Sequence, residues 1–181
     1  MLTYAYKQHL IAITKCQKEV ALRNIVVLEL LFSTGMRVSE VSNLKTSAIN
    51  LGDNTVRIFG KGSKERIMCI SDDLSKTISN YLVSRSQKSD YLLINRLGNR
   101  LSEQSIRYMV NDYANAVGAP LHITPHMFRH TFATELHNED VDIRYIQQFL
   151  GHSSIATTQI YTHISTSKTR EILESKHPRN K

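Results

Sequence analysis

The spacing of apolar residues along the chain predicts a mainly helical protein. Apolar side chains recur every three to four positions over residues 4–16, 19–34 and 37–44, and again over most of the chain after residue 72. Between these regions, Thr55–Phe59 and Glu65–Ile70 are short runs rich in β-forming residues, separated by a turn bounded by glycine, and Ala48–Leu51 offers a third strand. We therefore predict an α+β fold, mainly α with a small antiparallel β-sheet.

Capping residues indicate where the helices begin and end. The expected starts are Asp72 or Asp73 for a helix to about Arg85, Ser102, Thr124 with Pro125 in the first helical position, and Ser153 or Ser154; the expected ends are Gly35, Gly118 and Gly151, the last closing a helix over Ile143–Leu150. A final helix is expected near residues 168–175. The chain is long enough for one domain with a hydrophobic core.

The charge of the chain favours a polyanionic partner. Twenty-three Lys and Arg against 16 Asp and Glu give a formal net charge of +7, with nucleic acid the first candidate and an anionic membrane surface the second. A solvated basic surface without a partner explains the charge equally well. Two distant cysteines suit neither a disulfide framework nor a zinc module, and the apolar stretch Ile25–Phe32 contains Glu29 and is too short to span a bilayer. We expect a cytoplasmic protein.

Three basic side chains lie together in the helix predicted to begin at Pro125. His126, Arg129 and His130 occupy positions i, i+3 and i+4, so they share a face near the helix N-terminus, where the dipole favours an anion. Two histidines at this spacing could instead bind zinc, but zinc needs a third ligand and would lie beside the positive Arg129. For His130 alone, a structural hydrogen bond to the backbone is the preferred interpretation.

Other candidate residues come from earlier segments. Arg37 could grip phosphate oxygens as a planar fork held by Glu40, although taken alone this is a surface ion pair of little energetic value. Lys61, in the predicted hairpin turn, could protonate a leaving alkoxide, although most turn lysines serve solubility. We interpret Lys64 and Arg66 as contacts to a nucleic-acid backbone.

The last candidates lie near the C-terminus. A helical tyrosine such as Tyr161 usually packs in a core, but this one follows the polar residues 157–159 and lies downstream of His152. Each of these signals is weak singly. Their ordered combination of a phenol, imidazoles and guanidiniums indicates metal-free chemistry on a nucleic-acid phosphodiester.

Four segments together resemble the tyrosine recombinase (phage integrase) family, particularly its Xer-like and transposon integrases. They are Leu31–Glu40, Gly60–Arg66, Thr124–Thr134 and Leu150–His163, and they extend over nearly the whole chain. The resemblance implies the catalytic-domain fold of that family. It also implies a catalytic role for six residues: Arg37 and Arg129 holding the scissile phosphate, Lys61 as general acid, His126 accepting or relaying the proton of the nucleophile, His152 hydrogen-bonding the phosphate, and Tyr161 as nucleophile.

The resemblance further implies double-stranded DNA as partner, a monomer when free and a tetramer in synapsis, and neither cofactor nor metal. Residues 1–181 are expected to form a single catalytic domain without the N-terminal core-binding domain of the family. The tail, residues 164–181, would dock on a neighbouring subunit or pack on its own domain. A type IB topoisomerase, a non-catalytic DNA-binding module and a metal phosphodiesterase built on the histidines are the competing functions.

Overall fold

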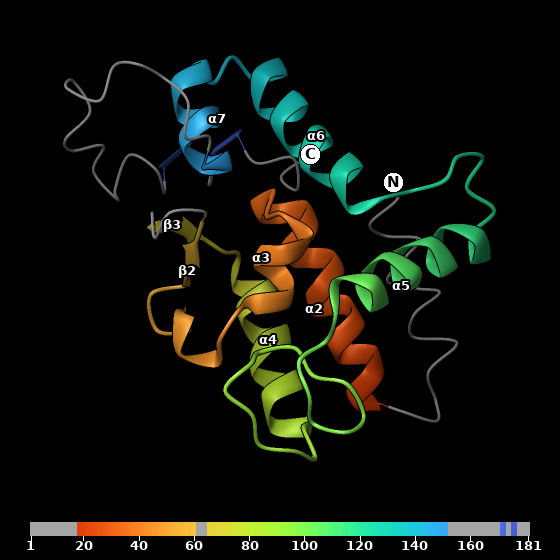
Figure 1. The fold of residues 1–181 in the computed structure, drawn as a ribbon. Helices are drawn as coiled ribbons and strands as arrows, with labels where there is room; N and C mark the ends of the chain where they lie inside the picture. Colours follow the sequence, from red (N-terminus) through yellow and green to blue (C-terminus); the bar gives the residue numbers. More distant parts are fainter. Residues whose placement is uncertain (1–17, 61–64, 152–170, 173–174, 177–181) are drawn as a thin grey trace.

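One central helix organises the protein. The computed structural model describes residues 18–60, 65–151, 171–172 and 175–176. Helix α2 (Lys18–Thr34) packs against α4 (Asp72–Ser84) and α6 (Pro125–Asn138), and Figure 1 shows it crossing the middle of the molecule. It also contacts α3 (Val38–Asn43) and α5 (Glu103–Ala116), so helices pack on several of its sides.

The sequence of α2 explains its central position. Val26, Val27, Leu30 and Leu31 have no exposed surface and lie along one face of the helix, while Leu28 and the polar Glu29 are buried on its other sides. Such a helix is stable only when other elements cover it. Each such side chain contributes about 2 kcal/mol when it is buried, so α2 anchors the hydrophobic core.

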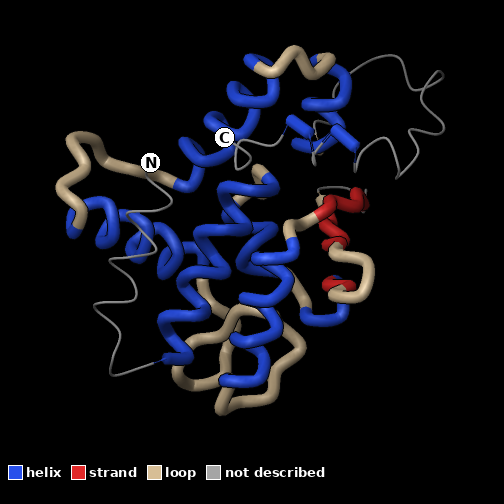
Figure 2. The backbone as a smooth tube through the Cα atoms, turned by 180° about the vertical axis from the view of Figure 1, so that it is seen from behind, coloured by secondary structure: helices blue, strands red, loops and turns tan. Residues whose placement is uncertain are grey.

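The small sheet lies at one edge of the molecule (Figure 2). Strands β1 (Ile49–Asn50), β2 (Thr55–Phe59) and β3 (Glu65–Cys69) form an antiparallel sheet in the order β1-β2-β3. Val56 pairs with Met68, and both side chains are fully buried. The predicted fold class, mainly α with a small antiparallel sheet, is therefore confirmed.

Most predicted helix ends agree with the structure, with one correction. Helix α5 begins after Ser102, and α7 (Ile143–Leu150) ends at Gly151, as expected. The cap of α4, however, is Ser71, whose hydroxyl accepts a hydrogen bond from the Leu74 amide at 3.2 Å. The two aspartates expected as alternative caps instead occupy the first turn, where the helix dipole stabilises negative charge.

The segment between α4 and α5 is irregular, although it lies in the part of the chain expected to be mostly helical. Leu92 and Leu93 are fully buried in it, and isolated bridges join Tyr91 to Lys45 and Ile94 to Arg100. These short contacts have no helical period, which is why the apolar pattern gave no separate signal for them.

The described part of the tail contacts its own domain. Ile172 packs against the hydrophobic core, and the Lys176 ammonium lies 3.8 Å from the Glu139 carboxylate just after α6. The helices predicted over residues 4–16 and around Tyr161 fall outside the described residues. None of the described helices is long and apolar enough to cross a membrane.

The turn between α2 and α3 depends on a glycine, and its replacement gives a first prediction. Gly35 has φ +59°, and a Cβ there would lie 2.7 Å from Cδ1 of Phe132. Gly35→Ala should lower the free energy of unfolding by about 2–4 kcal/mol, because strained backbone and overpacking add. Chemical denaturation measures this change.

Gly118→Ala is the matched control for this prediction. Gly118 also has a positive φ, +66°, but a Cβ there would meet nothing within 4 Å. We expect a loss of about 1 kcal/mol from backbone strain alone. Equal losses in the two variants would mean that the contact with Phe132 does not constrain position 35.

Candidate functional site

The site begins at the turn that follows α2. Gly35 ends α2 in the left-handed conformation, and Arg37 occupies the N-cap position of α3. The Arg37 amide donates a hydrogen bond to Oε2 of Glu40 at 2.7 Å, so a side chain in the first turn of α3 fixes the backbone of Arg37. The Arg37 side chain itself is 43% exposed and remains accessible to a ligand.

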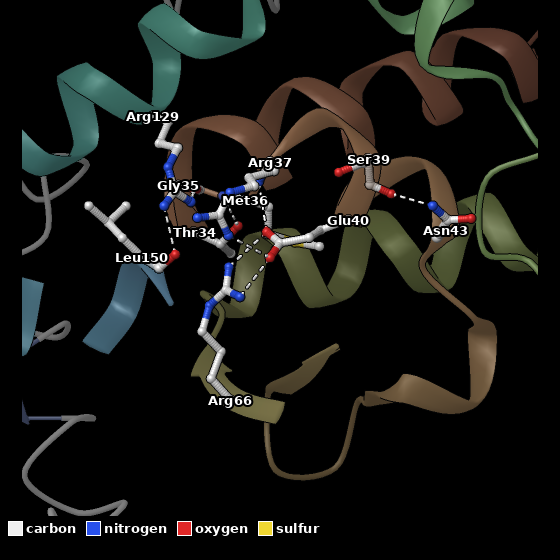
Figure 3. A network of polar contacts seen from close by, with 10 residues as sticks. All are labelled: Thr34, Gly35, Met36, Arg37, Ser39, Glu40, Asn43, Arg66, Arg129 and Leu150. Carbon is white, nitrogen blue, oxygen red and sulfur yellow. Dashed lines mark hydrogen bonds and ion pairs between the residues drawn. The ribbon is translucent and has the colours of Figure 1, made fainter. Parts of the chain in front are cut away.

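Arg129 ties three distant segments together at this turn (Figure 3). From α6, its Nη1 donates to the Gly35 carbonyl at 2.7 Å and its Nη2 donates to the Leu150 carbonyl at 2.6 Å. The residue is only 7% exposed. A guanidinium carries five N–H donors, so three remain after these two bonds. Arg129 thus links the ends of α2 and α7 and still has N–H donors for an anion.

Burial and neighbouring charges change the pKa of the Arg129 guanidinium. Burial lowers the pKa of its guanidinium to about 10, the positive charge of Arg37 acts in the same direction, and the Glu40 carboxylate opposes them. Arg129 stays protonated at neutral pH. The charge of Arg37 acts on Arg129 because the guanidinium of the α2–α3 turn and that of α6 lie near each other (Figure 3).

Glu40 is the buried acid of this region. Its side chain is 5% exposed, and both of its oxygens accept hydrogen bonds from Arg66 at 2.9 Å, with Nη1 on Oε1 and Nη2 on Oε2. Burial alone would raise the pKa of Glu40. The Arg66 hydrogen bonds and charge, together with the Arg37 amide and charge, outweigh burial and hold this pKa below its usual value.

Arg66 has a different environment from the one expected for a DNA backbone contact. Its side chain is 9% exposed and its guanidinium is held by Glu40 rather than facing solvent. The alternation along β3 could have indicated this, because Arg66 and the buried Met68 share a face while Glu65 and Ile67 are exposed. The partner, Glu40, is 26 residues away and gave no signal in the sequence.

The remaining candidates are distributed between described and undescribed parts of the chain. His126 and His130 are exposed on α6. The structural hydrogen bond preferred for His130 stays a prediction. Lys61, Lys64, His152 and Tyr161 lie outside the described residues. The structure therefore brings together Arg37, Glu40 and Arg129 from the candidate list and adds Arg66 to them in a new role.

This arrangement suits a phosphate. Three arginines surround a single carboxylate, so the cluster keeps net positive charge. The exposed Arg37 can present its planar fork, and the geometry of that fork matches two phosphate oxygens.

Known proteins resemble this chain in sequence and in fold. The model of the phage integrase family matches residues 3–168 of the 181. The chain belongs to the phage integrase family. A tyrosine recombinase of Agathobacter rectalis is 52% identical over 178 residues, covering 96% of this chain and 58% of that protein. The tyrosine recombinase XerC of Staphylococcus aureus is 39% identical, with 98% and 62% covered. This phage integrase family chain thus spans about three fifths of the length of these relatives.

Two solved structures share the fold of this phage integrase family member. The XerA recombinase superposes with a TM-score of 0.71 at 34% identity, covering 94% of this chain and 62% of that chain. The XerH site-specific recombinase, solved in a pre-cleavage complex with its difH substrate, gives a TM-score of 0.74 at 28% identity, with 94% and 51% covered. The predicted recombinase catalytic-domain fold is confirmed.

The described residues of this phage integrase family chain contain no cluster of metal ligands. Within residues 18–60, 65–151 and the short described pieces of the tail, no three His, Cys, Asp or Glu side chains form a group that could hold a metal ion. His126 and His130 lie within these ranges.

Replacing Arg129 should reveal its structural contribution. Lysine cannot donate to the Gly35 and Leu150 carbonyls with the same planar geometry, so Arg129→Lys leaves a buried acceptor without its donor. We expect the free energy of unfolding to fall by about 2–4 kcal/mol. Denaturant titration measures it.

Arg107→Lys serves as the control for that replacement. Arg107 is a half-exposed residue of α5 that pairs with Glu103 one turn away. Its change should stay below about 0.5 kcal/mol, as for other exposed helix pairs. If Arg129→Lys were equally mild, the two carbonyl bonds would not hold the site together.

Proposed function

We propose that this chain is the catalytic domain of a site-specific DNA recombinase that cleaves and rejoins DNA through a 3′-phosphotyrosyl intermediate. The observation that carries the proposal is the convergence of Arg37 and Arg129 on one region, with Arg129 bonded to the carbonyls of Gly35 and Leu150. The second of these carbonyls directly precedes Gly151 and His152 in the sequence, and Tyr161 follows nine residues later.

Cleavage begins with attack of the Tyr161 phenol oxygen on the scissile phosphorus. A new O–P bond forms, and His126 accepts or relays the phenol proton. The bond from phosphorus to the 5′ oxygen breaks on the opposite side, and Lys61 gives that oxygen a proton so that it leaves as a hydroxyl. The reverse attack by a 5′-hydroxyl of a partner duplex restores the DNA backbone and completes strand exchange.

The arginines act on the charge that develops in this step. The pentacovalent transition state carries more negative charge on its non-bridging oxygens than the ground state does. Donors fixed in advance stabilise that extra charge without reorganising, and in many enzymes this stabilisation accounts for most of the rate enhancement. Arg37, Arg129 and His152 take this role. The phosphotyrosine conserves the energy of the broken bond, so the reaction requires neither ATP nor a divalent metal.

The proposal includes the partners of the reaction. Double-stranded DNA is the substrate, with Lys64 as a backbone contact, and the free domain is a monomer that assembles as a tetramer in synapsis. The reaction takes place in the cytoplasm. The tail would exchange its contacts within the domain, such as Lys176 with Glu139, for contacts with a neighbouring subunit.

Replacing the nucleophile tests this function most simply. The substrate is a library of DNA duplexes of random sequence, each with a nick. When the protein cleaves near the nick, the short released strand diffuses away, so the covalent adduct cannot religate and accumulates. Tyr161→Phe removes the attacking oxygen, so it should abolish adducts while leaving DNA affinity unchanged. Denaturing gels detect the adduct, and gel shift measures binding.

Tyr108→Phe is the matched control for the nucleophile, because Tyr108 is an exposed tyrosine of α5. This variant should form adducts at the wild-type level. Adducts in Tyr161→Phe would show that another residue is the nucleophile. Relaxed plasmid without any product joined between duplexes would indicate topoisomerase chemistry instead.

Metal removal provides an independent prediction. Excess EDTA should leave the amount of wild-type adduct unchanged, because the attacking oxygen and the donors all belong to side chains. The control is a metal-dependent nuclease treated in parallel. A sharp loss of cleavage that added zinc or magnesium restores would support a metal phosphodiesterase.

A further inference from the structure

The Arg66–Glu40 pair joins the sheet to the arginine region. Arg66 is the second residue of β3, whereas Glu40 lies in α3 and also holds the Arg37 amide. The two 2.9 Å bonds are end-on and bidentate, the geometry in which a guanidinium and a carboxylate orient each other most strongly. The position of β3 and the backbone of Arg37 therefore depend on the same carboxylate.

Arg66 also touches the turn that follows α7. A Cβ placed on Gly151 would lie 2.9 Å from Nη1 of Arg66, so the guanidinium packs directly against this glycine. Arg129 holds the preceding residue, Leu150, through its carbonyl. The end of α7 is thus fixed by two arginines, one from β3 and one from α6.

A direct contact between Arg66 and DNA fits these observations poorly. Its side chain is 9% exposed, and its two terminal nitrogens are engaged by Glu40. Its Nε is buried and has no hydrogen-bond partner among the described residues, so within this part of the chain its hydrogen bonds all go to Glu40. The Glu40 carboxylate also balances the charge of Arg66, whereas the two carbonyls bound to Arg129 are neutral and leave the charge of Arg129 to act on a phosphate.

We infer that Arg66 is a positioning residue for the phosphate site, which aligns Glu40 with the Arg37 backbone and supports the Leu150–Gly151 turn. This inference rests on the proposed function. Arg66 acts through Glu40 and Gly151, so its loss displaces the arginine site without removing a DNA contact. A displacement of about 1 Å can reduce a rate about a hundredfold.

The inference predicts a change in rate rather than in affinity. Arg66→Lys keeps the charge but loses the bidentate fork, and Arg66→Gln loses both. The substrate is a nicked duplex that forms the covalent adduct with the wild-type protein and is isolated from the random-sequence library. Both variants should bind this duplex with unchanged Kd and unchanged salt dependence. At saturating DNA, adduct formation should be slower by about tenfold to a hundredfold.

The pH profile provides a readout that a general loss of packing would not change. The charged groups that face Glu40 in the described structure are Arg37, Arg66 and Arg129. Without Arg66, burial raises the pKa of Glu40, and a carboxylate contributes its interactions only above its pKa. Cleavage by Arg66→Gln should therefore decline at a higher pH than wild-type cleavage as the pH falls toward about 5.

Arg57→Gln is the matched control, because Arg57 belongs to the same hairpin but its side chain is 57% exposed and it lies 4.0 Å from Glu65. It should leave both the saturated rate and the pH profile unchanged. If the Arg66 variants lose affinity with a smaller salt dependence while cleaving at the wild-type rate once saturated, Arg66 contacts DNA and the inference is wrong. An unchanged pH profile in Arg66→Gln also overturns it.

Two further outcomes complete the test. If the single variants do not fold, the double variant Arg66→Met, Glu40→Met replaces both buried charges by apolar groups and should fold. Its cleavage should still be slow, and wild-type cleavage by the double variant would contradict the positioning role. Absence of any adduct from the wild-type protein would instead refute the proposed function, on which the inference depends.

Discussion

The site depends on the two hydrogen bonds from Arg129 to main-chain carbonyls. Gly35 and Leu150 lie 94 and 21 residues from Arg129 in the sequence. Gly35 directly follows the last residue of α2, and Leu150 is the last residue of α7. Carbonyls at helix C-termini lack partners within the helix, so a buried guanidinium satisfies both ends at once. Because its donors are fixed in this way, Arg129 is held in the same region as the exposed Arg37.

Glu40 makes this concentration of positive charge compatible with a folded protein. Three guanidiniums near one another repel, and burial makes the repulsion more costly. A single buried carboxylate that accepts from Arg66 and from the Arg37 amide offsets part of this cost. It leaves the net positive charge that a phosphodiester would neutralise. The same positive charges therefore lower the stability of the fold and favour binding of a phosphate.

Much of this fold could be predicted from local patterns, and the contacts of the site could not. Gly35, Ser102 and Gly151 were predicted as helix boundaries because caps and left-handed turns require particular residues nearby. The partnership of Arg66 with Glu40 escaped prediction because it joins residues that are distant in sequence. The inward alternation of β3 was the available signal. The burial of Arg129 was likewise not predicted, because the carbonyls that its guanidinium binds, those of Gly35 and Leu150, are distant in sequence.

The most direct test is a crystal structure of the Tyr161→Phe protein bound to its DNA site. The account predicts that the guanidiniums of Arg37 and Arg129 lie within hydrogen-bonding distance of the non-bridging oxygens of a single phosphate. It also predicts that Arg129 keeps its bonds to the carbonyls of Gly35 and Leu150. Two arginines bound to different phosphates, or an Arg129 that faces no DNA at all, would contradict it.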